Sequence, residues 1–514
     1  MTTSVNDRTS ASAPMRAGGT GALDSGGGWA NIAVVLAALM AMAAWLPFLH
    51  RPLTPDESGF LLIAQQWRPG HSLYGDYWVD RPPLLIWLFT LADHLGAVHL
   101  TAAGAATAPV LKLIGAVASG TSVALSGVLA GLVSPSHRSV RIMTVLVAAA
   151  LLSSPLLGMP GVNGELLALP FVLLGLVCAV AAMRGSWGWR TAALAAGVGA
   201  CGMAAALMKQ NVIDVFVFTL VLLAVSHRQV PRWRGRAAAV VVGAALPLST
   251  VILTAWAQGT SAPGLWDAVV VFRTHASEMI DASASSATAV RGALLVAAFL
   301  GSGAAVMLVT AVAAILARRT PLAWPALAMT GWEVFAIAMG GSYWLHYLTG
   351  IVPGLVLLVA IVRPGHGSRL ALRWAVAYTV AAALAVWTFH VVIPPQVTPE
   401  DQVSSYLREH AGPADGVVVG FGHPEIVAAS GLHSPYEHLW SLPVRVRDPH
   451  LAGLRDVLAG ASAPRWIVVD GDSLDTWGLD AGNVEQYLLR HYEERVSFDS
   501  WHIWQRRGLE GTRR

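Results

Sequence analysis

The chain has 514 residues, of which 55% are hydrophobic and 12% are charged, and its mean hydropathy is +0.57. A soluble globular protein carries roughly 25% charged residues, and the apolar excess falls in blocks of about 18 to 25 residues, the length that crosses a bilayer. This composition excludes a soluble enzyme, a disordered chain and a nucleic-acid-binding protein. The formal net charge of +3 says little about partners, because arginines at membrane edges give a positive charge to any polytopic protein.

Hydropathy predicts about eleven membrane spans. Residues 1–28 contain few apolar side chains and are predicted to form a disordered cytoplasmic tail. The first span, at 30–49, is long enough to be an uncleaved anchor. The others are expected at 107–133, 141–158, 164–183, 191–208, 211–226, 237–257, 292–316, 321–340, 348–362 and 374–393.

Arginines lie in alternate connections between these spans, and the positive-inside rule assigns those connections to the cytoplasm. The sequence therefore predicts a multi-pass protein of the plasma (inner) membrane with a cytoplasmic N-terminus. Its transmembrane domain covers 29–393, and outer loops lie at 51–106 and 258–291. An extracytoplasmic domain follows at 394–514. The arginines are Arg138, Arg141, Arg184, Arg190, Arg228, Arg232, Arg234, Arg236, Arg318, Arg319, Arg363, Arg369 and Arg373.

The segment after residue 394 has ordinary polarity and predicts a small α/β domain. Thr398 followed by Pro399 is a helix start. Short apolar runs at 417–421 and 466–469 predict buried strands, and residues 449–460 and 482–491 have helical periodicity.

The first outer loop contains two further helix starts. Thr54 precedes Pro55, with Asp56 and Glu57 in the first turn, where the helix dipole favours acids. A second helix is expected from Pro82, with an apolar face of Leu84, Leu85, Leu88 and Leu91. Both helices are too short to span a bilayer, so they are predicted to lie along the membrane surface.

The acid pair and the later Asp80-Arg81-Pro82-Pro83-Leu84 resemble the first outer loop of the GT-C membrane glycosyltransferases, in the branch of the protein O-mannosyltransferases and lipid A aminoarabinose transferases. Arg81 stands where that branch usually has Lys, which keeps the charge but not the geometry. The likeness continues in order along the chain, at Asn163-Gly164-Glu165, Lys209-Gln210-Asn211 and Gly341-Ser342-Tyr343-Trp344-Leu345-His346-Tyr347.

The resemblance implies a GT-C-like fold and a sugar donor carried on polyprenyl phosphate. The sugar would pass to an acceptor hydroxyl on a glycan, lipid or protein of the cell envelope, by single displacement with inversion. The acceptor must lose a proton as it attacks, which calls for a carboxylate base, and Asp56 is predicted to be that base. Glu57 lies about 100° further round the helix, so it is expected to support catalysis by binding acceptor or orienting a cation.

The departing phosphate requires cationic donors, and Arg81, Lys209 and His346 are the predicted ones. Each has a structural alternative. Arg81 is also explained as a partner for Asp80, Lys209 as a snorkelling lysine, and His346 as a packing residue. Arg273 in the second outer loop is a weaker candidate. The predicted substrate-binding residues are Asp80, Glu165, Tyr343 and Glu333. Glu165 and Tyr343 are also explained by a helix dipole and by an interfacial aromatic belt.

Glu333 lies inside a predicted span, where a charge normally faces a cavity or a partner. Asp214 is expected to pair with a neighbour for the same reason. Lys112, near the outer end of the second span, is open equally to a functional role and to snorkelling, and it is left out of the predicted site.

No protein metal site is predicted, because His423, His433 and His438 lack metal-ligand spacing. A divalent cation such as Mg²⁺ or Mn²⁺ stays an open possibility, since some GT-C enzymes use one. The competing interpretations are a lipid or sugar transporter or flippase, which would typically show paired repeats and broken helices, and a non-catalytic scaffold.

Overall fold

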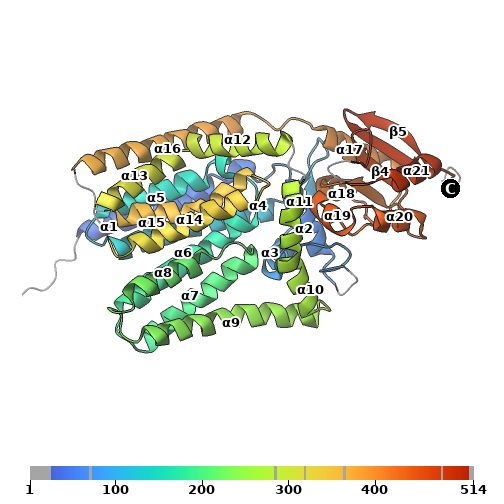
Figure 1. The fold of residues 1–514 in the computed structure, drawn as a ribbon. Coiled ribbons are helices and arrows are strands. Elements are labelled where there is room, and N and C mark those ends of the chain that lie inside the picture. Colours follow the sequence, from blue (N-terminus) through green and yellow to red (C-terminus); the bar gives the residue numbers. More distant parts are fainter. Residues whose placement is uncertain are drawn as a thin grey trace, which may run out of the picture.

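A computed structural model describes residues 25–68, 72–282, 286–317, 320–362, 366–475 and 479–508. The described chain forms an elongated helical bundle with a small domain of strands and short helices at one end (Figure 1). Helix α1 begins at Ser25, inside the predicted tail, and the rest of that tail lies outside the described residues. Arg318, Arg319 and Arg363 lie outside them too.

Every predicted span coincides with a helix or with a pair of helices. The bundle comprises α1 (Ser25–Ala43), α4 (Pro109–Val133), α5 (Arg138–Leu152), α6 (Gly164–Arg184), α7 (Trp189–Met208), α8 (Asp214–Ser226), α9 (Trp233–Ala257), α12 (Ser286–Gly301), α13 (Ala304–Ala317), α14 (Ala323–Met339), α15 (Val352–Ile361) and α16 (His366–Val392). Short helices η1 (Leu46–Phe48), η2 (Pro155–Leu157) and η4 (Leu345–Ile351) join some of them.

Six helices of the described chain are long and apolar enough to cross a membrane, or seven if one bent pair counts as a single span. The chain is therefore a multi-pass membrane protein, and the count of eleven spans stays a prediction. The bent pair is α12 and α13, whose axes differ by 59°. The predicted span at 292–316 coincides with this pair, in which the helix breaks at Ser302-Gly303.

The outer helices of the bundle are apolar on faces that no other part of the protein covers. Only 17% of the apolar window of α9 and 22% of that of α16 are buried, against 61% for the central helices α4 and α6. Leu246 on α9 and Phe389 on α16 are among the exposed apolar side chains. A bilayer is the environment that accounts for such surfaces.

The C-terminal domain contains a four-stranded mixed sheet in the order β3-β4-β6-β5. Strands β3 (Val417–Gly420) and β4 (Trp466–Asp470) are the two predicted apolar strands. They pair in parallel. Strands β5 (Tyr492–Phe498) and β6 (Trp501–Arg506) add an antiparallel hairpin. Five helices accompany the sheet: α17 (Pro399–His410), α18 (Pro424–Ser430), α19 (Ser441–Arg447), α20 (Ala452–Ala459) and α21 (Gly482–His491).

Helices α2 (Pro55–Gln65) and α3 (Pro83–Leu95) lie where the bundle meets the C-terminal domain, together with α10 (Ala262–Trp266), η3 (Asp267–Val271) and α11 (Phe272–Ala282) (Figure 1). A short ladder of β1 (His99–Leu100) and β2 (Ala106–Thr107) completes the first loop. All residues of α2 from Glu57 to Ala64 are buried within the protein, and its position along the membrane surface stays a prediction. On α3 the buried face is Leu85, Ile86 and Phe89, whereas Leu91 of the predicted face is exposed.

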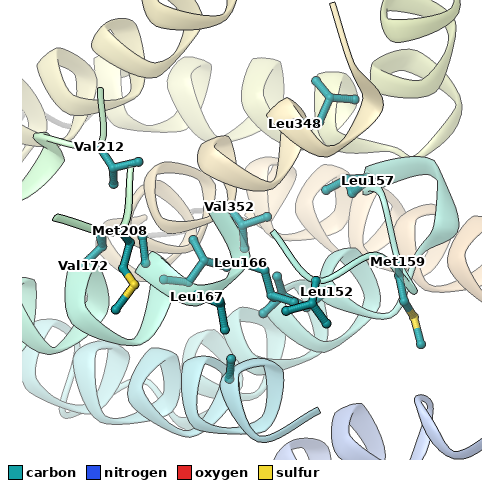
Figure 2. Close-up of a cluster of buried hydrophobic side chains, with 14 of the residues drawn as sticks. Leu152, Leu157, Met159, Leu166, Leu167, Val172, Met208, Val212, Leu348 and Val352 are labelled. Atoms are coloured by element: carbon teal, nitrogen blue, oxygen red, sulfur yellow. The ribbon is translucent and has the colours of Figure 1, made fainter. Parts of the chain in front are cut away.

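A cluster of buried apolar side chains holds the loop before α6 in place (Figure 2). Leu152 and Leu157 precede this loop in the chain, and Leu166 and Leu167 follow it on α6. Val352 of α15 belongs to the same cluster. All five side chains are nearly inaccessible to solvent. The cluster therefore fixes the start of α6, which carries Glu165.

His438 lies in the contact between the first loop and the C-terminal domain. Its ring packs against Trp78, with centroids 6.0 Å apart, and against Tyr436 at 5.4 Å. Burial lowers the pKa of His438 to about 4; Asp448 opposes this shift and Arg447 adds to it. Because the pKa in the unfolded chain is near 6.5, the unfolded state binds more protons between these two values.

We therefore expect the stability of the folded protein to fall as the pH drops from about 6.5 to about 4. At roughly 1.4 kcal/mol per pKa unit the full effect is roughly 3 kcal/mol. Replacing His438→Phe should flatten this dependence while keeping the aromatic contacts. The measurement is the thermal unfolding midpoint at pH 7.5 and pH 5.0. If wild type and His438→Phe lost the same number of degrees between pH 7.5 and pH 5.0, His438 would not be the group responsible.

Candidate active site

Asp56 lies on the first turn of α2, where the bundle meets the C-terminal domain. Thr54 caps this helix in a capping box with Glu57, as the sequence predicts. The indole Nε1 of Trp440 donates a hydrogen bond to Asp56 Oδ1 at 3.1 Å. Gly59 makes room for this indole, because a Cβ there would lie 2.2 Å from the Trp440 ring. The C-terminal domain therefore orients the predicted base.

Glu57 points away from Asp56 into the bundle and forms a buried ion pair with Lys112. The Lys112 Nζ donates to Oε1 at 2.7 Å and to Oε2 at 2.8 Å. The backbone N–H of Val162 donates to Oε1 and that of Thr54 to Oε2. These four bonds use the carboxylate's whole acceptor capacity. Glu57 is therefore held in a buried ion pair, and Lys112, which the sequence left open, is its partner rather than a snorkelling lysine.

Asp80 joins two arginines from different parts of the chain. Its Oδ1 accepts from Arg81 at 2.7 Å, and its Oδ2 lies 2.6 Å from the Arg273 guanidinium on α11. Burial would raise the pKa of Asp80, but Arg273 and then Arg81 lower it below its ordinary value. Burial also opposes the charge of Arg81, yet Asp80 and next Asp56 raise its pKa. Asp56 and Arg81 are thus close enough to interact electrostatically.

Glu165, Lys209 and His346 form a second cluster beside the first. Lys209 donates to Glu165, and His346 Nε2 lies 3.8 Å from the same carboxylate. The Lys209 Nζ also lies 4.2 Å from the ring centroid of Tyr347, a cation–π contact. Asn163 caps α6 by accepting from the Leu166 N–H at 2.9 Å, which directs Glu165 toward the end of α7.

Gln210 connects the two clusters. Its Nε2 donates to the Asp80 carbonyl at 2.9 Å, so the turn after α7 is fastened to the first outer loop. Arg81, Arg273 and Lys209 together face the two carboxylates of Asp80 and Glu165. With Asp56, whose charge raises the pKa of Arg81, three carboxylates balance these three cations. Burial lowers the pKa of Arg273; Asp80 opposes this shift and the charge of Arg81 adds to it. A bound anion would relieve the repulsion between Arg273 and Arg81.

Two predicted substrate-binding residues lie apart from these contacts. The Tyr343 hydroxyl donates to the Ala338 carbonyl at 3.4 Å, and Tyr347 is the tyrosine next to Lys209. Glu333 is buried on α14 beneath Gly350 of η4. Asp214 is buried too, and both its carboxyl oxygens lack a hydrogen-bond partner among the described residues.

The carboxylates of the site do not form a metal site. Glu57, Asp80 and Glu165 are each paired with lysine or arginine. Within the described ranges, no three His, Cys, Asp or Glu side chains are grouped closely enough to hold a metal ion. These donors fit cationic side chains better than Mg²⁺ or Mn²⁺, so no step of the proposed reaction is assigned to a metal.

Two features of the site were not predicted from the sequence: the contact of Trp440 and the ion pair of Lys112. Lys112 and Lys209 are the only lysines of the chain, and both form ion pairs here. This scarcity was a usable signal for Lys112. Nothing in the local sequence marks Trp440, because it reaches the site through a tertiary contact. Arg273, the weaker phosphate-binding candidate, joins the site through its ion pair with Asp80.

The fold is that of known membrane enzymes. Crystal structures of ArnT from Cupriavidus metallidurans superpose with TM-scores of 0.59 in the apo state and 0.58 when bound to undecaprenyl phosphate. The sequence identity is 12% in both comparisons. The match covers 94% of this chain for the apo structure and 93% for the bound one, and 98% of ArnT in each case. The chain therefore has the fold of ArnT. The resemblance predicted from the first outer loop is confirmed at the level of the fold.

The oligosaccharyltransferase of Archaeoglobus fulgidus is similar over a smaller part of its own length. Its complex with Zn and sulfate has a TM-score of 0.52 and 14% identity, covering 85% of this chain and 68% of that protein. Its complex with an inhibitory peptide and a dolichol-phosphate also has a TM-score of 0.52, with 12% identity, and covers 94% and 74%. No protein-family model and no curated protein sequence matches the chain.

The Glu57–Lys112 pair gives a stability prediction. Glu57→Gln leaves the Lys112 charge buried without a counterion, and breaking such a pair typically costs about 3–5 kcal/mol. We expect a clear drop in the thermal unfolding midpoint of the purified protein. The double variant Glu57→Gln with Lys112→Met removes both charges and should recover part of the loss. Full stability of the Glu57→Gln variant would show that the ion pair does not anchor α2.

Proposed function

We propose that the protein is a glycosyltransferase that moves a sugar from a polyprenyl-phosphate donor to an acceptor hydroxyl, by single displacement with inversion. The observation that carries this proposal is the placement of Asp56, held by Trp440, next to a cluster of partly buried cations at the end of the helical bundle. The fold shared with ArnT, which has been solved with undecaprenyl phosphate bound, supports it.

Asp56 acts as the base. The Trp440 N–H holds Oδ1, and Oδ2 accepts no hydrogen bond from the described residues. This arrangement fixes the carboxylate and leaves one oxygen to take the acceptor proton. Glu57 cannot share the role while its four acceptor positions are occupied. We assign Glu57 to positioning α2, which replaces the expected contact with acceptor or cation.

Arg81, Arg273 and Lys209 bind the donor phosphate. They come from three separate elements, and their N–H groups would stabilise the charge that develops on the phosphate oxygens as the bond to the sugar breaks. A phosphate is already a good leaving group, so no general acid is required. His346 lies next to Glu165 and can donate a further hydrogen bond. Asp80 and Glu165 hold the cationic side chains in place.

The membrane orientation follows from the arginine pattern. We place the N-terminus in the cytoplasm and the domain at 394–514 outside the plasma membrane, with the site at the outer lipid–water boundary. Contacts between the first loop and the C-terminal domain, such as Trp78 N–H to the Glu437 carbonyl at 3.0 Å, are consistent with both lying on one side.

A transporter or flippase is the second candidate, and the bend between α12 and α13 favours it. Transporters of that design place broken helices in corresponding positions of two halves, whereas the described chain has a single bent pair of this kind. The transporter interpretation also gives no role to the contact between Asp56 and Trp440. The transferase explains both the acid and the cations.

Replacing Asp56→Asn should lower the transfer rate by about 10²–10⁴-fold, because the amide cannot accept the acceptor proton. The assay measures transfer from polyprenyl-phosphate sugars in membranes or detergent. Asp93→Asn is the matched control, since Asp93 accepts a hydrogen bond from Gln65 on the neighbouring helix outside the site. Transfer that persists in the correctly folded Asp56→Asn protein would contradict the mechanism.

Arg273→Gln removes one charge from the phosphate-binding cluster. Bonds to charged groups are worth about 1.5–3 kcal/mol, so we expect binding of polyprenyl phosphate to weaken about 10- to 100-fold. Arg68→Gln is the control, because Arg68 pairs with Asp76 on the same outer loop and is exposed. Equal lipid affinity of the Arg273→Gln and wild-type proteins would remove Arg273 from the site.

A further inference from the structure

An open hollow of about 470 Å³ lies at the start of α9, at the end of the bundle opposite the candidate active site (Figure 1). Helix α6 leads from Glu165 of that site to the turn beside the hollow. At 1.5 Å per residue, the 21 residues of α6 span about 30 Å, which is the thickness of the hydrocarbon core of a bilayer. The hollow therefore lies one membrane thickness from the site. It is lined by Trp187, Arg232, Trp233, Arg234 and Gly235.

This end of the bundle has arginines but no neighbouring acids. No Asp or Glu lies between Glu165 and Asp214, or between Asp214 and Asp267. Glu165 and Asp214 lie in the first turns of α6 and α8, and Asp267 follows the far end of α9. Helices α6 to α9 therefore provide no carboxylate here. The arginines of these helix ends and turns are Arg184, Arg190, Arg228, Arg232, Arg234 and Arg236.

Arg236 fixes the shape of the hollow. This buried side chain donates to the Gly185 carbonyl at 2.7 Å and to the Pro231 carbonyl, so it joins the turn after α6 to the turn before α9. Its guanidinium also lies 5.6 Å from the ring centroid of Trp187. Gly235 lets that ring lie against α9, because a Cβ there would be 2.9 Å from it. Backbone carbonyls are neutral, so they leave the positive charge of Arg236 in place.

Arg232 and Arg234 are exposed at the hollow and can contact a ligand. Helix α9 has no acid in its first turn and no side chain that caps it. Cations at a helix N-terminus are unfavourable, whereas its free N–H groups attract anions. An anion would relieve both the helix dipole and the repulsion between the guanidinium groups. The planar fork of a guanidinium matches the oxygens of a phosphate.

The apolar surface beside the hollow indicates that the phosphate belongs to a lipid. Val241 and Val242 of α9 are each 69% exposed and lie about 12 Å further along the helix than Trp233. Trp233 and Trp189, at the starts of α9 and α7, are exposed too. Indole rings at the end of an apolar surface are typical of a membrane–water boundary. Acyl chains of a lipid bound here would cover the exposed face of α9.

We propose that the hollow binds the phosphate of an anionic phospholipid in the leaflet that we place on the cytoplasmic side. Arg232 and Arg234 donate to the phosphate oxygens, and the acyl chains lie along α9. Basic pockets between membrane helices on that side are suited to such head groups. The inference does not rest on the transferase function. The polyprenyl carrier belongs to the proposed site at the other end of the bundle and is not the occupant.

Lipid binding to the full-length protein in detergent tests this proposal. The probes are phosphatidylglycerol and phosphatidylcholine with the same acyl chains, titrated and counted by native mass spectrometry. We expect wild type to bind one phosphatidylglycerol at least tenfold more tightly than phosphatidylcholine. The double variant Arg232→Asn with Arg234→Gln should lose this preference. Asn suits position 232, because Arg232 has a φ of +54°, which Asn adopts more readily than most residues.

The variant Arg369→Gln with Arg373→Gln is the matched control. It removes two charges as well, from exposed arginines of α16 that lie outside the hollow, and should keep the preference. Equal affinity of wild type for the two lipids would overturn the site. An equal loss in the two double variants would overturn it too, because the arginines would then act only as a general surface charge.

Two further measurements cover a misfolded double variant and a soluble ligand. Arg234→Gln alone keeps the turn before α9 and should weaken phosphatidylglycerol binding about tenfold; unchanged affinity would contradict the assignment. Phosphatidylglycerol should raise the thermal unfolding midpoint of wild type more than phosphatidylcholine does. Inorganic phosphate, compared with chloride at equal ionic strength, should not displace the lipid. Displacement would replace the lipid site by a site for free phosphate.

Discussion

Glu57 and Lys112 form an ion pair in the interior, where neither side chain reaches solvent. Removing two charges from water is expensive, and only dense hydrogen bonding offsets it. Here the carboxylate accepts four bonds, and Lys112 also donates to the Pro160 carbonyl at 3.0 Å. The pair thereby fastens α2, α4 and the loop before α6 to one another. The positions of Asp56 and Glu165 both depend on that connection.

The two adjacent acids consequently have different environments. Consecutive helix residues point about 100° apart, so Glu57 enters the bundle while Asp56 faces Trp440 of the C-terminal domain. One acid is neutralised by a lysine and the other stays available near Arg81. One helical turn therefore carries both Glu57, which anchors α2, and Asp56, the proposed base.

Much of the fold could be predicted from the sequence because its determinants are local. Capping by Thr54, Asn163 and Thr398 is a matter of side chains within three residues of the helix start, and the apolar runs correspond to helices. The hairpin β5–β6 was not predicted, because β5 follows α21 without an intervening turn.

The candidate site residues stay predictions, and their contacts with one another could not be predicted from the sequence. Asp56, Arg81, Lys209 and Glu165 were identified by resemblance, but the partner of each charge depends on tertiary structure. Trp440 is 384 residues from Asp56 in the chain, and Arg273 reaches Asp80 from another loop. No local pattern encodes such contacts.

The most direct measurement is a structure of the protein with polyprenyl phosphate bound. The account predicts phosphate oxygens within about 3 Å of nitrogen atoms of Arg81, Arg273 or Lys209, with open space for a sugar between the phosphate and Asp56. A phosphate bound at the opposite end of the bundle, near the arginines that precede and begin α9, would contradict it.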